Sequence, residues 1–172
     1  FRSPVCCVFP FHKYSNITIT IGIFMDLKVR LWIYEGTKEY QTKMNYFRNG
    51  KFYPYKDSLG KLTIGCGHLV LKSENFSDGI TEKEANKLLS RDLANVILEV
   101  QSLGLSVPDD WNDFLIIMTF QLGINGVKKF KRMMTALKAK NYREAIVQAK
   151  DSLWYRQTPN RVDDMIRQLT NK

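Results

Sequence analysis

The chain has 172 residues, of which 44% are hydrophobic and 25% charged; this composition excludes collagen-like, low-complexity and disordered proteins. Lys and Arg number 26 against 17 Asp and Glu, so the formal net charge is +9. That excess predicts a polyanionic partner: nucleic acid, an anionic membrane or an anionic cell-wall polymer. The cysteines Cys6, Cys7 and Cys66 form neither a disulfide framework nor a zinc motif. We therefore expect free thiols, no metal and no cofactor.

The first 24 residues differ in character from the rest. They begin without Met, and from Ile17 to Ile23 they alternate Ile with Thr or Gly, which is typical of a β-strand. Their apolar stretches are too short to span a bilayer, so we expect no stable membrane insertion. Because Met25 opens a different pattern, we interpret residues 1–24 as an N-terminal extension, a translated leader or a fragment of something upstream. The alternative is an extra edge strand.

A short helix followed by a small antiparallel β-lobe is predicted for residues 25–80. Apolar residues at helical spacing indicate a helix over 26–35 that ends at Gly36. Between 40 and 71 the pattern changes to that of strands. Asn49-Gly50 among aromatic residues predicts a hairpin, and Ser58-Leu59-Gly60 predicts a second turn, after which Leu62, Ile64 and 69–71 continue the sheet.

The remainder of the chain reads as helical. Thr81 and Glu84 form a capping box at the start of a helix predicted to run from about 82 to 101. An apolar run from Phe114 to Phe120 predicts a buried helix, and further helices are expected over 127–140, 142–151 and 159–169, the last capped by Thr158. The predicted fold class is α+β, with a small β-lobe (25–80) and a larger helical lobe (102–172) joined by a long helix (81–101).

Three polar residues suggest glycosidase chemistry by their positions. Glu35 closes the first helix, Asp57 leads into a turn, and Thr63 opens the run Thr-Ile-Gly-Cys-Gly-His that ends at His68. A helix end facing a hairpin can hold two carboxylates on opposite sides of a groove, as glycoside hydrolysis requires. Taken singly, each residue has a plainer interpretation: a solvated acid, a turn former, a strand residue and a structural histidine.

Taken together and in order, these motifs resemble the phage-type lysozymes, glycoside hydrolase family 24. The resemblance covers about residues 25–169, with Met25 where the family chain begins. It rests on these matching segments: Glu35-Gly36, Tyr55-Lys56-Asp57, 63–69, 79–85 with Arg91-Asp92, 120–130 and 154–161.

The resemblance implies an inverting muramidase that cleaves between N-acetylmuramic acid and N-acetylglucosamine in peptidoglycan. Glu35 would be the general acid, a role that needs a carboxyl still protonated near neutral pH. Asp57 and Thr63 would orient and activate the attacking water, and inversion implies carboxyl groups about 6.5–9.5 Å apart. The resemblance also places Gln121, Phe120 and Met118 at the substrate groove. It makes His68 and Asp92 a structural salt bridge between the β-lobe and the long helix.

The sequence departs from the family pattern in three places. Between Glu35 and Asp57 lie 21 residues, far more than in T-even lysozymes, and the surplus (about 38–53) is predicted to form an added hairpin. The segment from Leu69 to Thr81 is shorter than in those relatives. The chain also stops soon after the last motif. We expect these differences to affect groove shape, glycan length preference and stability, and to leave the three catalytic candidates intact.

The leading functional hypothesis is a monomeric enzyme that lyses the host. It would wait in the host cytoplasm for a membrane-permeabilising partner and then act at the cell wall in the periplasm. The first alternative is a lysozyme domain of a phage tail or baseplate protein, and the second is an inactive wall-binding module. A nucleic-acid binder is disfavoured because no DNA-reading motif is present. Residues 121–150 hold eight Lys or Arg and one acid, so we expect activity to fall with added salt.

Overall fold

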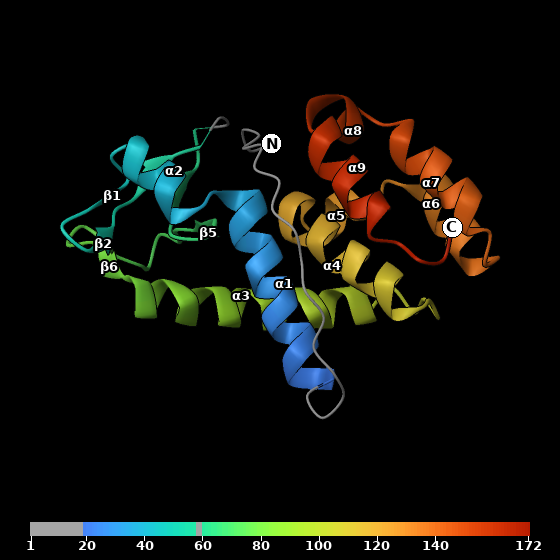
Figure 1. Cartoon of the computed structure of the whole chain (residues 1–172), viewed down its shortest axis with the longest axis horizontal. Coiled ribbons are helices and arrows are strands. Elements are labelled where there is room, and N and C mark those ends of the chain that lie inside the picture. Colours follow the sequence, from blue (N-terminus) through green and yellow to red (C-terminus); the bar gives the residue numbers. More distant parts are fainter. Residues whose placement is uncertain (1–18, 58–59) are drawn as a thin grey trace. The chain divides into compact units, whose positions relative to one another are not determined.

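The structure is a computed structural model that describes residues 19–57 and 60–172, with side chains from Leu27 onward. The extension before residue 19 and Ser58-Leu59 of the second predicted turn lie outside the described residues. The chain divides into two compact units, one ending at Asp92 and the other comprising Leu93–Lys172. The boundary falls within helix α3 (Glu82–Gln101), which Figure 1 shows as one continuous helix. A small antiparallel β region is thus followed along the chain by a larger helical region, as the α+β prediction states.

Helix α1 (Ile19–Glu35) is longer than the sequence pattern indicated. The strand predicted for Ile17–Ile23 is wrong from residue 19 onward, because helix α1 runs through Met25 without a break. Leu27, Leu31 and Tyr34 are buried along one side of this helix. Once such a face is packed, each added residue contributes one more helical hydrogen bond. The isoleucines therefore extend the helix, since β propensity depends strongly on context.

The surplus segment forms a helix and a hairpin, so the prediction of a hairpin over the whole of 38–53 is wrong in its first half. Helix α2 (Lys38–Lys43) is capped by Thr37, whose Oγ1 accepts a hydrogen bond from the Tyr40 backbone N–H. Strands β1 (Phe47–Arg48) and β2 (Lys51–Phe52) then pair antiparallel. Asn49 and Gly50 both have positive φ, 51° and 73°, as a type I′ turn requires. The Asn-Gly hairpin is confirmed.

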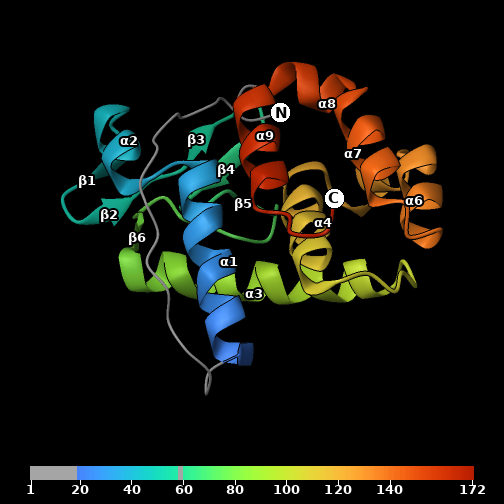
Figure 2. The same ribbon diagram turned by 45° about the vertical axis from the view of Figure 1, so that its right-hand side comes forward.

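The strands form two sheets where the sequence pattern suggested one. The first has the order β1-β2-β6, with β6 at Ile80–Thr81, and the second has the order β3-β4-β5. Strands β3 (Tyr55–Lys56), β4 (Leu62–Ile64) and β5 (His68–Leu69) of the second sheet are seen together in Figure 2. Pro54 separates β2 from β3, and proline cannot donate to a strand ladder. A small core of Phe52, Ile64, Ile80 and Ala85 lies in this unit.

The start of α3 is as predicted. The Thr81 backbone N–H donates to Glu84 Oε2 at 2.7 Å, and the Glu84 N–H donates to Thr81 Oγ1 at 3.3 Å. This reciprocal pair is a capping box. None of the described helices is both long and apolar enough to cross a bilayer.

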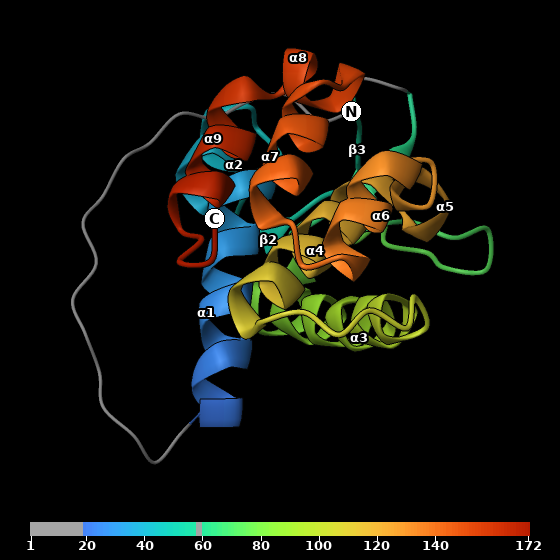
Figure 3. The same cartoon turned by 90° about the vertical axis from the view of Figure 1, so that its right-hand side faces the viewer.

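The second unit is helical after α3. Its helices are α4 (Asp109–Leu122), α5 (Ile124–Val127), α6 (Lys131–Lys138), α7 (Tyr142–Lys150), α8 (Leu153–Gln157) and α9 (Pro159–Arg167). Trp111 and Trp154 are almost fully buried, and α6 and α7 lie side by side (Figures 1 and 3). The helix expected over 127–140 is interrupted, because a turn joins the Lys131 N–H to the Lys129 carbonyl. Thr158 precedes α9 without capping it by its side chain; its hydroxyl donates to the Trp154 carbonyl.

Candidate active site

Glu35 is the last residue of α1, and it is 8% exposed. The helix ends there because Gly36 adopts a φ of 124°, which a residue with a side chain rarely takes. The Gly36 N–H still donates to the Trp32 carbonyl at 3.2 Å, which closes the final turn. The glycine therefore ends the helix directly after a carboxyl side chain that is largely buried.

Asp57 and Thr63 lie on the two arms of one hairpin. Asp57 directly follows β3, and Thr63 is fully buried in β4, where it pairs with Tyr55. Asp57 also shapes the turn, since its Oδ1 accepts from the Lys61 N–H at 2.9 Å and its carbonyl accepts from the Gly60 N–H. The hairpin thus brings together two of the three residues predicted to be catalytic.

Gln41 connects the end of α1 to the turn that follows the strand carrying Thr63. Its Nε2 donates to the Gly36 carbonyl at 3.0 Å and to the Gly65 carbonyl at 2.9 Å. Gly36 directly follows Glu35, and Gly65 is two residues beyond Thr63. Sequence reasoning missed Gln41, because a single glutamine in a polar helix of six residues carries no recognisable signal. Its burial, at 1% exposed, is the property that distinguishes it, and burial appears only in the folded chain.

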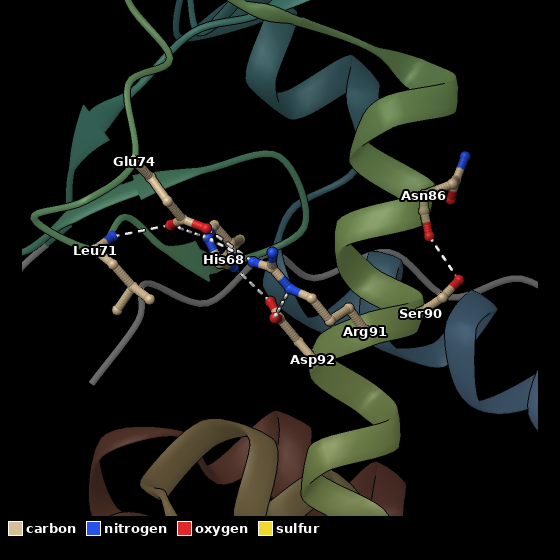
Figure 4. Close-up of polar contacts among 7 residues, drawn as sticks. All are labelled: His68, Leu71, Glu74, Asn86, Ser90, Arg91 and Asp92. Carbon is tan, nitrogen blue, oxygen red and sulfur yellow. Dashed lines mark hydrogen bonds and ion pairs between the residues drawn. The ribbon is translucent and has the colours of Figure 1, made fainter.

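His68 lies between two carboxylates, as Figure 4 shows. Its Nδ1 is 2.7 Å from Asp92 Oδ2, and its Nε2 is 2.8 Å from Glu74 Oε2. Ionised carboxylates only accept hydrogen bonds, so His68 donates to both partners when each ring nitrogen carries a proton, as in the imidazolium form. Arg91 donates to the other oxygen of Glu74 at 2.9 Å, and the Leu71 N–H donates to Glu74 Oε2 at 3.0 Å. The structure therefore joins β5, the following loop and α3 through one charged cluster.

The cluster shifts the pKa of both His68 and Glu74. The hydrogen bond to Asp92 raises the pKa of His68 above 6.5; burial opposes this and the contact with Glu74 adds to it. Burial by itself would raise the pKa of Glu74, but the Leu71 N–H, His68 and Arg91 outweigh it and lower that pKa to about 2. Opposite charges and donated hydrogen bonds favour the ionised form of each partner. The sequence pointed to the His68–Asp92 pair and missed Glu74.

The three residues predicted at the substrate groove lie on α4 in the helical unit. Met118 is completely buried, whereas Phe120 and Gln121 are half-buried. Gln121 Oε1 accepts a hydrogen bond from Trp154 Nε1 at 2.9 Å, so this side chain is held in a fixed orientation. Met118 packs inside the unit, and the substrate-binding role of all three residues stays a prediction. Among the described residues, no group of His, Cys, Asp or Glu is arranged to hold a metal ion.

Comparison with known proteins gives consistent results. The family model described as phage lysozyme matches residues 47–169, which include Asp57 and Thr63 and begin after Glu35. The chain is 33% identical over 134 residues to the pre-baseplate central spike protein Gp5 of Enterobacteria phage T4, a match that covers 62% of this chain and 23% of the spike protein. It therefore spans less than a quarter of that relative.

Two relatives from Dictyostelium discoideum are matched over most of their length. The chain is 26% identical over 151 residues to probable T4-type lysozyme 2 and 27% identical over 150 residues to probable T4-type lysozyme 1. Each match covers 72% of this chain and 88% of the relative. These matches bear out the resemblance carried by the motifs. Because the family model covers well over half of its residues, the chain belongs to the phage lysozyme family, whose members are glycoside hydrolases of the lysozyme class.

Proposed function

We propose that the chain is a muramidase that hydrolyses the β-1,4 bond between N-acetylmuramic acid and N-acetylglucosamine with inversion at the anomeric carbon. One observation carries the proposal: a buried carboxyl, Glu35, ends a helix that Gln41 ties to the turn directly after the hairpin bearing Asp57 and Thr63. Two carboxyl groups and a hydroxyl, held by separate elements, are the groups an inverting glycosidase needs.

In this mechanism each residue has one role. Glu35 donates its proton to the glycosidic oxygen as the bond to the anomeric carbon breaks. Asp57 accepts a proton from the attacking water, and the Thr63 hydroxyl orients that water on the opposite face of the sugar. Thr63 is suited to this, since among the described residues its hydroxyl donates only to the Lys61 carbonyl, at a long 3.4 Å.

The decisive experiment compares wild type with Glu35→Gln on purified peptidoglycan and on outer-membrane-permeabilised bacteria. Loss of a general acid costs ~10² or more in rate, so we expect clearing by wild type and at least that loss in the variant. Glu39→Gln is the matched control, because Glu39 is exposed on α2, and it should retain wild-type activity.

Several outcomes would contradict the proposal. Equal activity of Glu35→Gln and wild type would remove Glu35 from the mechanism. A wild type that binds the wall without clearing it would favour an inactive wall-binding module. The first product should be the α-anomer, because the substrate bond is β and the mechanism inverts; a β-anomer would exclude inversion.

Within the same chemistry, host lysis and cell entry are distinct roles. We propose lysis, in which the monomeric chain accumulates in the host cytoplasm and reaches the periplasm after a partner permeabilises the membrane. Co-expression with a membrane-permeabilising protein should then cause lysis, and expression of the chain alone should not. The similarity to spike protein Gp5 favours a tail-associated role as the second candidate. Co-purification with a multisubunit phage tail would support that candidate.

A further inference from the structure

We infer that Gln41 is a positioning residue of the active site, one that fixes the carboxyl at the end of α1 relative to the strand that holds the attacking water. The inference rests on the proposed function and adds to it a residue of the surplus segment. Gln41 is supplied by α2, which lies within the stretch where this chain departs from the family pattern.

The geometry of Gln41 supports a purely donating role. A side-chain amide nitrogen has two hydrogens, and Gln41 donates one to the Gly36 carbonyl and one to the Gly65 carbonyl. Both partners are carbonyl oxygens, so the nitrogen must be the atom that faces them. Gln41 Oε1 is buried and accepts no hydrogen bond from any described residue. The side chain is therefore held through its donor end.

The backbone around Gln41 fixes α2 in place. The Gln41 N–H donates to the Thr37 carbonyl at 2.9 Å, and its carbonyl accepts from the Tyr46 N–H at 2.8 Å. These bonds tie the residue both to the helix start and to the hairpin that follows. An anchored backbone combined with a buried side chain leaves the amide little freedom, and rigid support of this kind is what keeps a catalytic group in its productive position.

The two acceptors are placed where a small displacement matters. A shift of about 1 Å in a catalytic group can cost ~10² in rate. Gly36 and Gly65 are both buried, with positive φ of 124° and 59°. A Cβ on Gly65 would lie 3.2 Å from the Ala85 Cβ, so this turn has little room to readjust if the Gln41 bridge is removed.

The test is Gln41→Met, which keeps the length of the side chain and removes both donors. We expect kcat on soluble peptidoglycan fragments to fall at least tenfold, with KM within about twofold of wild type, since the substrate contacts remain. The assay is run well below the Tm of each variant. Gly79→Ala is the matched control. It should lower Tm in the same unit, because its φ is +69° and a Cβ would lie 2.8 Å from the Phe52 carbonyl, yet it should keep kcat.

A second variant, Gln41→Glu, provides a readout that depends on the hydrogen bond itself. A protonated carboxyl donates one hydrogen bond and an ionised one donates none. The kcat of Gln41→Glu relative to wild type should therefore rise as the pH is lowered, while the ratio for Gln41→Met stays flat. Full kcat in Gln41→Met, or an equal loss of kcat in Gly79→Ala, would overturn the inference. If Glu35→Gln stays active, the proposed mechanism itself fails. If Glu35→Gln is inactive while Gln41→Met keeps full kcat, the mechanism stands and the positioning role of Gln41 fails.

Discussion

At the scale of single residues, burial decides what an ion pair contributes. The Lys38–Glu82 and His68–Asp92 pairs have the same 2.7 Å separation. The side chains of Lys38 and Glu82 are 43% and 56% exposed, whereas that of His68 is 7% exposed. An exposed pair is worth little after solvent screening and the loss of side-chain entropy. A buried pair that loses one partner leaves an uncompensated charge, which costs far more.

This difference gives a pH-dependent prediction for Glu74→Gln. The raised pKa of His68 contributes stability below pH 6.5, and this is lost as the pH rises through the pKa of the folded state. The pKa of Glu74, lowered from 4.5 to about 2, contributes stability above pH 4.5, and this stability is lost as the pH falls through 2. Both contributions to stability are therefore present together between pH 4.5 and pH 6.5. There Glu74→Gln should lower the free energy of unfolding by about 2 kcal/mol.

Urea denaturation of wild type and Glu74→Gln across the pH range measures this difference. It should be largest between pH 4.5 and 6.5 and shrink at higher pH, as His68 loses its proton on passing through its raised folded-state pKa. The control is Glu82→Gln, which removes the exposed Lys38–Glu82 pair at 2.7 Å and should cost less than about 1 kcal/mol. A difference that is constant with pH, or equal costs for the two variants, would contradict the role given to the cluster.

At the scale of elements, helical periodicity predicted α3, α7 and α9 close to their observed bounds, whereas the alternating strand pattern at Ile17–Ile23, from residue 19 onward, and the cap expected at Thr158 did not hold. The capping box at Thr81 and the Asn49-Gly50 turn each depend on residues within three positions, and both are confirmed. The strand expected at Ile17–Ile23 failed over the described residues, because an apolar run this short does not by itself separate a strand from a helix. The division into two sheets depends on how Phe52 pairs with Ile80, a contact distant in sequence.

The candidate site also contains residues that the sequence predicts and residues that only the folded chain reveals. Glu35, Asp57 and Thr63 were predicted because their order and spacing match a family, and their catalytic roles stay predictions. His68 and Asp92 were predicted for the same reason, and the structure shows their contact. Gln41 and Glu74 could not be found that way. Each makes its important contacts through a segment whose length is particular to this chain: Gln41 with Gly65, 24 residues away, and Glu74 with Arg91, 17 residues away. Only the fold brings those partners together.

At the scale of the whole molecule, the distribution of charge is the feature that remains to be related to function. Of the net charge of +9, residues 121–150 contribute eight basic side chains against Glu144 alone. Three of them, Lys129, Lys131 and Arg132, line an open cavity of about 410 Å³ together with Asp151. These three cations make no ion pair with any residue that the structure describes. Surfaces of one sign attract oppositely charged partners over long distances, and peptidoglycan carries the carboxylates of its peptides.

The corresponding prediction concerns the dependence of activity on salt. Raising the ionic strength from about 0.01 M to about 0.15 M shortens the Debye length from about 30 Å to about 8 Å, so kcat/KM on intact peptidoglycan should fall about tenfold or more. The kcat at saturating substrate should change little, because screening acts on encounter. The triple variant Lys138→Gln, Lys140→Gln and Arg143→Gln removes three exposed charges and should flatten the salt dependence. Its counterpart Lys138→Arg, Lys140→Arg and Arg143→Lys keeps them and should follow wild type. If the neutralised variant loses activity with salt as steeply as wild type does, the basic residues of the helical unit do not attract the wall, and their excess belongs to another polyanion.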